Sequence, residues 1–133
     1  MRITTLAIMV LLILTACTPA VTPAPTVTFD PLSTGAPVIV DVNGRSFVIF
    51  CYGTGSPVVI LESGLGADWS YWKNVYTGMP ADIRVCMYTR SASSHTSLEF
   101  VEDLHALLAE AHLAGSYVLV GHSFGGLNVI LYA

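Results

Sequence analysis

A serine flanked by glycines is the group in this sequence best suited to chemistry. Ser123 stands in the run Gly121-His122-Ser123-Phe124-Gly125, which fits the G-x-S-x-G pattern of a nucleophile elbow. The residues two before and two after the serine must be small, because the chain turns so sharply that larger side chains would collide. A serine in such a turn stands clear of the sheet with a helix N-terminus behind it. The pattern predicts Ser123 as a nucleophile.

The segments on either side of this motif decide between catalysis and an incidental serine in a glycine-rich turn. Residues 117–120 form a short run of β-branched and aromatic residues, which predicts a buried strand. Residues 127–133 are apolar and predict a helix. Strand, tight turn and helix in this order are the context that a nucleophile elbow requires. We therefore interpret the motif as catalytic.

The N-terminus predicts a targeting segment. Arg2 precedes nine consecutive apolar residues, 6–14, whereas a helix that spans a bilayer needs about 20. Residues 1–16 are therefore interpreted as a cleaved signal peptide. They lead into Cys17 through Leu-Thr-Ala, which resembles the lipobox of bacterial lipoproteins and implies acylation of Cys17. An ordinary secretory signal with a stray cysteine is the alternative.

The next segment predicts a tether between a membrane and a domain. Residues 17–36 are rich in proline and threonine and carry almost no charge, so they are expected to stay extended and to bury little. A lipid on Cys17 would then hold the protein on a membrane of the cell envelope, outside the cytoplasm.

Residues 37–133 are long enough for one small domain. The net charge of −4, with a single lysine (Lys73), provides no basic patch, which argues against a nucleic-acid partner. The four histidines have no metal-ligand spacing, so we expect neither a metal nor another cofactor.

Alternating strand and helix signals place this domain in the α/β class, with a mainly parallel sheet and helices on both faces. Asn43-Gly44 lies between two apolar runs and predicts an antiparallel N-terminal hairpin. The predicted strands are residues 38–42, 46–51, 58–61, 85–88 and 117–120. Asp68 is expected to cap a short helix that ends before Gly78 and Pro80.

A longer helix is predicted after residue 96. Thr96 and Glu99 have the spacing of a capping box, and Gly115 is expected to end the helix. Apolar residues then recur at helical spacing and predict the face that packs on the sheet. These residues are Leu98, Val101, Leu104, Leu108 and Ala111.

Together, these motifs resemble the α/β-hydrolase superfamily, from about residue 37 onward. The resemblance rests on Asn43-Gly44, on Leu-Glu-Ser-Gly-Leu-Gly at 61–66, on Arg-Val-Cys-Met-Tyr at 84–88, and on the elbow. It implies a serine hydrolase that cleaves a small-molecule ester or related acyl bond through an acyl-enzyme. It also implies that the amides of Leu65 and Phe124 form the oxyanion hole. A plain strand-to-helix turn at residues 64–66 is the alternative.

The same resemblance predicts that catalytic groups are missing. Family members place an acidic residue and then a histidine after the serine, and neither follows Ser123 in this sequence. We interpret His95, His105, His112 and His122 as surface or packing residues. The sequence therefore predicts the N-terminal part of a hydrolase, inactive and poorly stable alone because the last strand would be an edge. A membrane-tethered non-catalytic remnant, or a ligand-binding pseudo-hydrolase, is the alternative.

Two cysteines remain once Cys17 is assigned to a lipid. The family's strand order puts the strand that ends at Cys51 beside the strand that holds Cys86, which implies a disulfide in an oxidising compartment. Two buried free cysteines that act as small apolar side chains are the alternative. The resemblance also breaks at Thr89, where the family commonly has aspartate.

Overall fold

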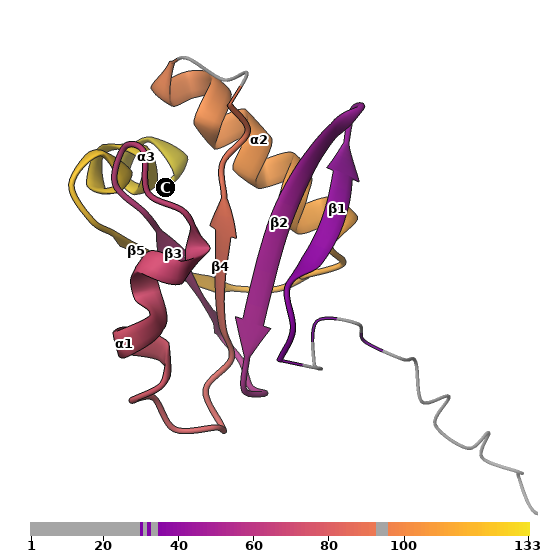
Figure 1. Ribbon diagram of the computed structural model, residues 1–133, viewed down its shortest axis with the longest axis vertical. Helices are drawn as coiled ribbons and strands as arrows, with labels where there is room; N and C mark the ends of the chain where they lie inside the picture. The colour runs from indigo at the N-terminus through magenta and orange to yellow at the C-terminus, as the bar shows by residue number, and fades with distance from the viewer. Residues whose placement is uncertain (1–29, 31, 33–34, 93–95) are drawn as a thin grey trace, which may run out of the picture.

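The fold is built on a five-stranded sheet. The computed structural model describes residues 30, 32, 35–92 and 96–133. The strands are β1 (Val38–Val42), β2 (Arg45–Tyr52), β3 (Val58–Glu62), β4 (Val85–Thr89) and β5 (Tyr117–Gly121), in the spatial order β1-β2-β4-β3-β5 (Figure 1). Strand β2 is antiparallel to β1 and β4, whereas β3 is parallel to β4 and β5. The predicted sheet with its N-terminal hairpin is confirmed.

Helices cover both faces of this sheet, as predicted (Figure 1). They are the 3₁₀ helix η2 (Trp69–Trp72), α1 (Lys73–Tyr76), α2 (Ser97–Glu110) and α3 (Phe124–Tyr132). Successive strand residues alternate between the two faces. Ile60 and Cys86 join the buried cluster that includes leucines of α2, while Leu61 and Met87 join the cluster around Trp72 of η2.

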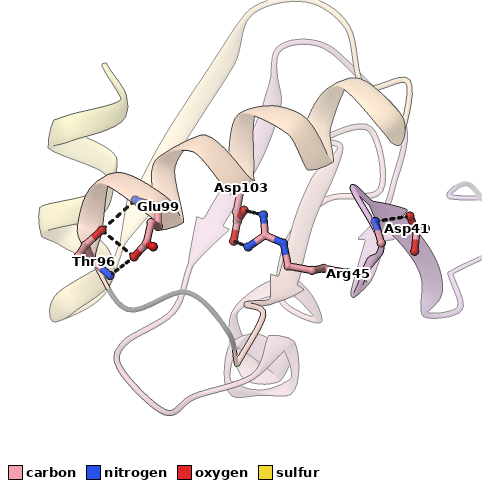
Figure 2. Close-up of polar contacts among 6 residues, drawn as sticks. Asp41, Arg45, Thr96, Glu99 and Asp103 are labelled. Atoms are coloured by element: carbon pink, nitrogen blue, oxygen red, sulfur yellow. Dashed lines mark hydrogen bonds and ion pairs between the residues drawn. The ribbon is translucent and has the colours of Figure 1, made fainter.

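The hairpin between β1 and β2 follows its sequence signal. Asn43 and Gly44 both have positive φ, 53° and 77°, as the turn that Asn-Gly favours requires. The Asp41 carboxylate accepts a hydrogen bond from the Gly44 amide at 3.0 Å (Figure 2). This turn fixes the register in which Val42 faces Arg45.

The helix predicted after Asp68 is present but irregular. The Asp68 carboxylate accepts hydrogen bonds from the Ser70 hydroxyl at 2.6 Å and the Ser70 amide at 2.8 Å, and these bonds lower the pKa of Asp68. The chain forms a 3₁₀ turn before the short helix α1, and Val75 is exposed. The predicted cap at Asp68 is confirmed.

The longer helix, α2, begins as predicted and buries part of the predicted stripe. Thr96 and Glu99 form the capping box (Figure 2). Leu98 is 57% exposed, and the buried residues of α2 are Phe100, Asp103, Leu104, Leu107 and Leu108. The predicted stripe is therefore confirmed at Leu104 and Leu108, and Ala111 packs against the same core, but the burial expected for Leu98 is wrong. Asp103 pairs with both terminal nitrogens of Arg45 on β2, which fixes the rotation of the helix against the sheet.

The end of α2 also differs from its prediction. His112, not Gly115, takes the left-handed conformation that closes the helix, with φ of 54°. The Leu113 amide bonds the Leu108 carbonyl at 3.0 Å, as in a Schellman motif. Because Leu113 is buried in the core, the helix ends earlier than Gly115 alone predicts.

Packing against the domain begins before the predicted boundary at residue 37. Leu32 is buried in the cluster beneath α2. The Asp30 carboxylate pairs with Arg84 at 2.6 Å and accepts from the Leu32 amide at 2.9 Å. The predicted signal peptide (1–16) and Cys17 lie outside the described residues. No helix in the described part of the chain has the length and apolar character to cross a membrane.

Strand β5 lies at one end of the sheet's strand order. Val118 and Val120 are 45% and 39% exposed, so the prediction of a buried strand is wrong for the face that they occupy. On the other face, Tyr117 and Leu119 of β5 border an apolar groove of about 510 Å³ with Ile130 of α3. An apolar edge strand of this kind favours association with another strand.

A disulfide joins Cys51 on β2 to Cys86 on β4 in the structure. The two residues are direct partners in the antiparallel ladder, and their Cα atoms lie 4.1 Å apart. This distance falls just below the usual disulfide range of roughly 4.4–6.8 Å and is typical of the narrow pairs of an antiparallel ladder.

We expect reduction of this disulfide to lower the free energy of unfolding by about 2–4 kcal/mol, because the bond closes a loop with a sequence separation of 35 residues. Denaturant titration with and without reductant measures the change, and Cys51→Ala with Cys86→Ala is the matched control that reductant should not affect. Equal thiol counts before and after reduction of the denatured protein would contradict the disulfide.

Candidate active site

The turn from β5 into α3 has the geometry of a nucleophile elbow. Strand β5 ends at Gly121 and helix α3 begins at Phe124. Ser123, between them, has φ of 55° and ψ of −123° and is exposed. Residues in such sparsely populated regions cost roughly 1–3 kcal/mol each and cluster at functional sites. The predicted strand, turn and helix are confirmed; the role of Ser123 as nucleophile stays a prediction.

Glycines permit this turn by bringing backbone against backbone. A Cβ at Gly125 would stand 2.3 Å from the Glu62 carbonyl oxygen and 2.6 Å from that of Ser63. A Cβ at Gly121 would stand 2.4 Å from the Gly125 carbonyl oxygen. The His122 amide donates to the Glu62 carbonyl at 3.0 Å. The elbow is therefore seated directly on the end of β3.

The loop after β3 lies beside the serine. The Ala67 amide donates to the Gly64 carbonyl at 3.3 Å, and Gly66 has φ of 75°, which together form a tight turn centred on Leu65 and Gly66. A Cβ at Gly64 would stand 3.4 Å from Ser123 Cβ. Close approach of this loop to the serine is what an oxyanion hole requires.

The two amides predicted to form that hole donate to no acceptor within the described residues. The Leu65 amide lies in the exposed turn, and the Phe124 amide lies at the start of α3, where helix amides have no partner of their own. Their role stays a prediction.

A buried charged group that the sequence analysis did not assign lies beneath these loops. Glu62 ends β3, and its carboxylate pairs with Arg90 at 2.6 Å; the side chains are 1% and 8% exposed. Asn128 of α3 donates to the same Glu62 oxygen at 3.0 Å. The sequence signal for this group is weak, because a glutamate after an apolar strand usually lies at the surface.

Tyr88 on β4 adjoins this group. Burial raises the pKa of the Tyr88 phenol well above its ordinary value, and the negative charge of Glu62 raises it further. The Tyr88 hydroxyl and Glu62 Oε2 are both buried, and neither forms a hydrogen bond with another of the described residues. Tyr88 therefore stays protonated at physiological pH.

The described histidines are engaged away from the serine. His122 Nε2 lies 3.3 Å from the Tyr71 hydroxyl, and the two rings are tilted by 31° with centroids 5.0 Å apart. His105 Nδ1 lies 3.4 Å from the Tyr132 hydroxyl. His112 closes α2, and His95 lies outside the described residues. None of the three described rings is bonded to Ser123.

A cavity of about 320 Å³ opens beside the loop after β3, within the usual size range of small-molecule sites. It is lined by residues 65–68, 89–92 and Phe100. Leu65 thus lines this cavity and belongs to the loop that borders the serine. Within the part of the chain that the structure describes, no cluster of three or more His, Cys, Asp or Glu residues could hold a metal ion.

No family model matches the chain. Three curated proteins are similar to it. A karrikin insensitive 2 receptor from Petunia hybrida is 26% identical over 59% of this chain, and a putative carbamate hydrolase, RutD, from Cronobacter sakazakii is 27% identical over 55%. A probable transporter, efuK, from Hormonema carpetanum is 27% identical over 56%. The chain spans 33%, 30% and 12% of their respective lengths.

Solved structures decide the fold. An epoxide hydrolase from Vigna radiata matches 73% of this chain with a TM-score of 0.62 and 22% identity. One from an endophytic Streptomyces matches 75% with a TM-score of 0.62 and 24% identity. This is the α/β-hydrolase fold. The chain covers about a third of each matched structure, 34% and 33%, so the comparison concerns a portion of an α/β-hydrolase fold.

We expect Gly125→Ala to lower the free energy of unfolding by about 1–3 kcal/mol, because its new methyl group collides with the backbone at the end of β3. Gly126→Ala is the matched control. It lies in the same helix, its nearest neighbour would be 3.9 Å away, and alanine should stabilise the helix by roughly 0.5–1 kcal/mol. Denaturant titration compares the two, and equal losses would contradict a close-packed elbow.

Proposed function

We propose that this chain carries the nucleophile and the oxyanion site of a serine hydrolase that cleaves an ester or related acyl bond. The observation that carries the proposal is the backbone of Ser123, whose strained φ and ψ place an exposed hydroxyl against the Gly64 loop. A structural turn has no need of that strain, since Gly in the same place would relieve it.

The proposed reaction proceeds through an acyl-enzyme. Ser123 Oγ attacks the substrate carbonyl carbon and transfers its proton to a general base. The carbonyl oxygen becomes an oxyanion that the Leu65 and Phe124 amides stabilise, each donor contributing about 2.7–4 kcal/mol. The leaving group departs with the proton, and water then hydrolyses the acyl-enzyme. A residue other than the three described histidines must therefore act as the general base.

Similar proteins support an acyl-type substrate in broad terms. RutD from Cronobacter sakazakii is described as a putative carbamate hydrolase, and a carbamate contains an acyl carbon open to attack by an alkoxide. The 320 Å³ cavity next to Leu65 offers room for a small substrate.

Ser123 should react covalently with a fluorophosphonate probe in the full-length polypeptide that contains these residues, since its hydroxyl is exposed and adjoins two free amides. Ser123→Ala should abolish labelling, whereas Ser46→Ala, which removes an exposed serine of β2 far from the elbow, should leave it unchanged. Intact-protein mass spectrometry measures the adduct. A folded protein that stays unlabelled would count decisively against the proposal.

A ligand-binding protein without catalysis is the second candidate. It is favoured by the engagement of His122 with Tyr71, which leaves no described histidine on Ser123. A similar curated protein is named as a receptor. Such a protein would bind a small molecule in the cavity and show no adduct in the labelling experiment.

We also propose that Cys17 carries a lipid that anchors the protein to a membrane of the cell envelope. The Leu-Thr-Ala-Cys sequence and the preceding apolar run support this proposal. In a bacterial host, Cys17→Ala should release the protein from the membrane fraction and abolish incorporation of labelled fatty acid. Cys51→Ala, which leaves the lipobox intact, is the control for general effects of cysteine loss.

A further inference from the structure

The Arg90 guanidinium occupies the junction of the two loops that bear the candidate oxyanion amides. It follows β4 and is nearly buried. Nη1 donates to the Glu62 carboxylate at 2.6 Å and to the Ser63 carbonyl at 2.6 Å, and Nη2 donates to the Gly64 carbonyl. Arg90 thus binds three consecutive residues of the segment that precedes Leu65.

The bond to the Gly64 carbonyl determines where the Leu65 amide points. In a planar trans peptide the C=O of one residue and the N–H of the next point in opposite directions. The Gly64 carbonyl also accepts the Ala67 amide. With that carbonyl held toward Arg90, the Leu65 N–H is directed away from the guanidinium. A flip of this one peptide would withdraw the donor.

The same guanidinium also contacts the residue that supplies the second amide. Its carbon lies 5.1 Å from the centroid of the Phe100 ring and 5.9 Å from that of Phe124, and the two rings meet edge to face at 5.7 Å. Cation–π contacts of this kind stabilise desolvated arginines. Phe124 is the first residue of α3 and directly follows Ser123, so the residue that carries the second candidate amide also holds its ring against Arg90.

We propose that Arg90 is a positioning residue that orients both oxyanion amides. It orients the Leu65 amide by binding the Gly64 carbonyl, and the Phe124 amide by its contact with the Phe124 ring. This inference rests on the proposed hydrolase function. A simple ion pair with Glu62 would need only one contact. Arg90 instead uses its planar fork to hold two backbone carbonyls as well, a geometry that lysine, as a point charge, does not reproduce.

The test compares Arg90→Lys with Arg45→Lys in the full-length polypeptide. Arg45 is the matched control because it also forms a two-pronged pair with a buried carboxylate, that of Asp103 (Figure 2). It also lies over the aromatic ring of Phe47, 5.8 Å from the centroid. Among its contacts with the described residues, none is with a backbone carbonyl of the loop after β3. Hydrolysis of p-nitrophenyl acetate gives kcat and KM, and ¹⁵N relaxation gives the order parameter of the Leu65 amide.

We expect Arg90→Lys to lower kcat by about 10²–10³-fold, the effect of losing one oxyanion donor, with KM nearly unchanged. The Leu65 order parameter should fall from about 0.85 to below about 0.6. Arg45→Lys should change neither quantity. The inference is overturned when Arg90→Lys keeps kcat and a rigid Leu65 amide, or when both variants lower kcat equally.

Two further measurements separate this inference from folding and from the proposed function. Should Arg90→Lys unfold, Arg90→Gln with Glu62→Gln removes both buried charges at once and should still lower kcat and loosen Leu65. An unlabelled wild-type Ser123 would defeat the hydrolase proposal, whereas the Leu65 order parameter would still decide whether Arg90 aims that amide.

Discussion

The buried ion pair between Glu62 and Arg90 is the interaction on which the rest of the candidate site depends. It joins the ends of β3 and β4, and Asn128 extends it to α3, the helix that follows the serine. Removing one partner of a buried pair typically costs about 3–5 kcal/mol, because the other charge is left uncompensated. The pair therefore commits two parallel strands and a helix to one arrangement.

That arrangement is what can sustain the strain at Ser123. The elbow rests on the Glu62 and Ser63 carbonyls through Gly125, with no room for a side chain, so any movement at the end of β3 reaches the serine directly. Strained residues persist only where the surroundings over-determine them. Arg90 binds the Glu62 carboxylate and the Ser63 carbonyl, and Gly125 packs against the carbonyls of the same two residues. The end of β3 is therefore constrained both by the ion pair and by the elbow.

Local signals in the sequence predicted the elements well. Asn43-Gly44, the Thr96 capping box and the glycine–serine–glycine turn each depend on neighbours within a few residues, and each is found in the structure. The order of elements, together with the motif spacing, was enough for the fold class. The disulfide partners followed from strand order, which the family resemblance supplied.

Contacts between distant residues were beyond such reasoning. Leu98 has the right spacing for a core position, yet the ion pair of Asp103 with Arg45, 58 residues earlier, turns the helix so that Leu98 faces solvent. Glu62 and Arg90 are 28 residues apart, and each alone predicts a surface charge. Their meeting becomes predictable only once β3 and β4 are known to be adjacent and parallel, since the carboxyl ends of such strands lie at one edge of the sheet. A charged residue at or just after the carboxyl end of each of two adjacent parallel strands is therefore the sequence signal to seek when a buried pair supports a loop.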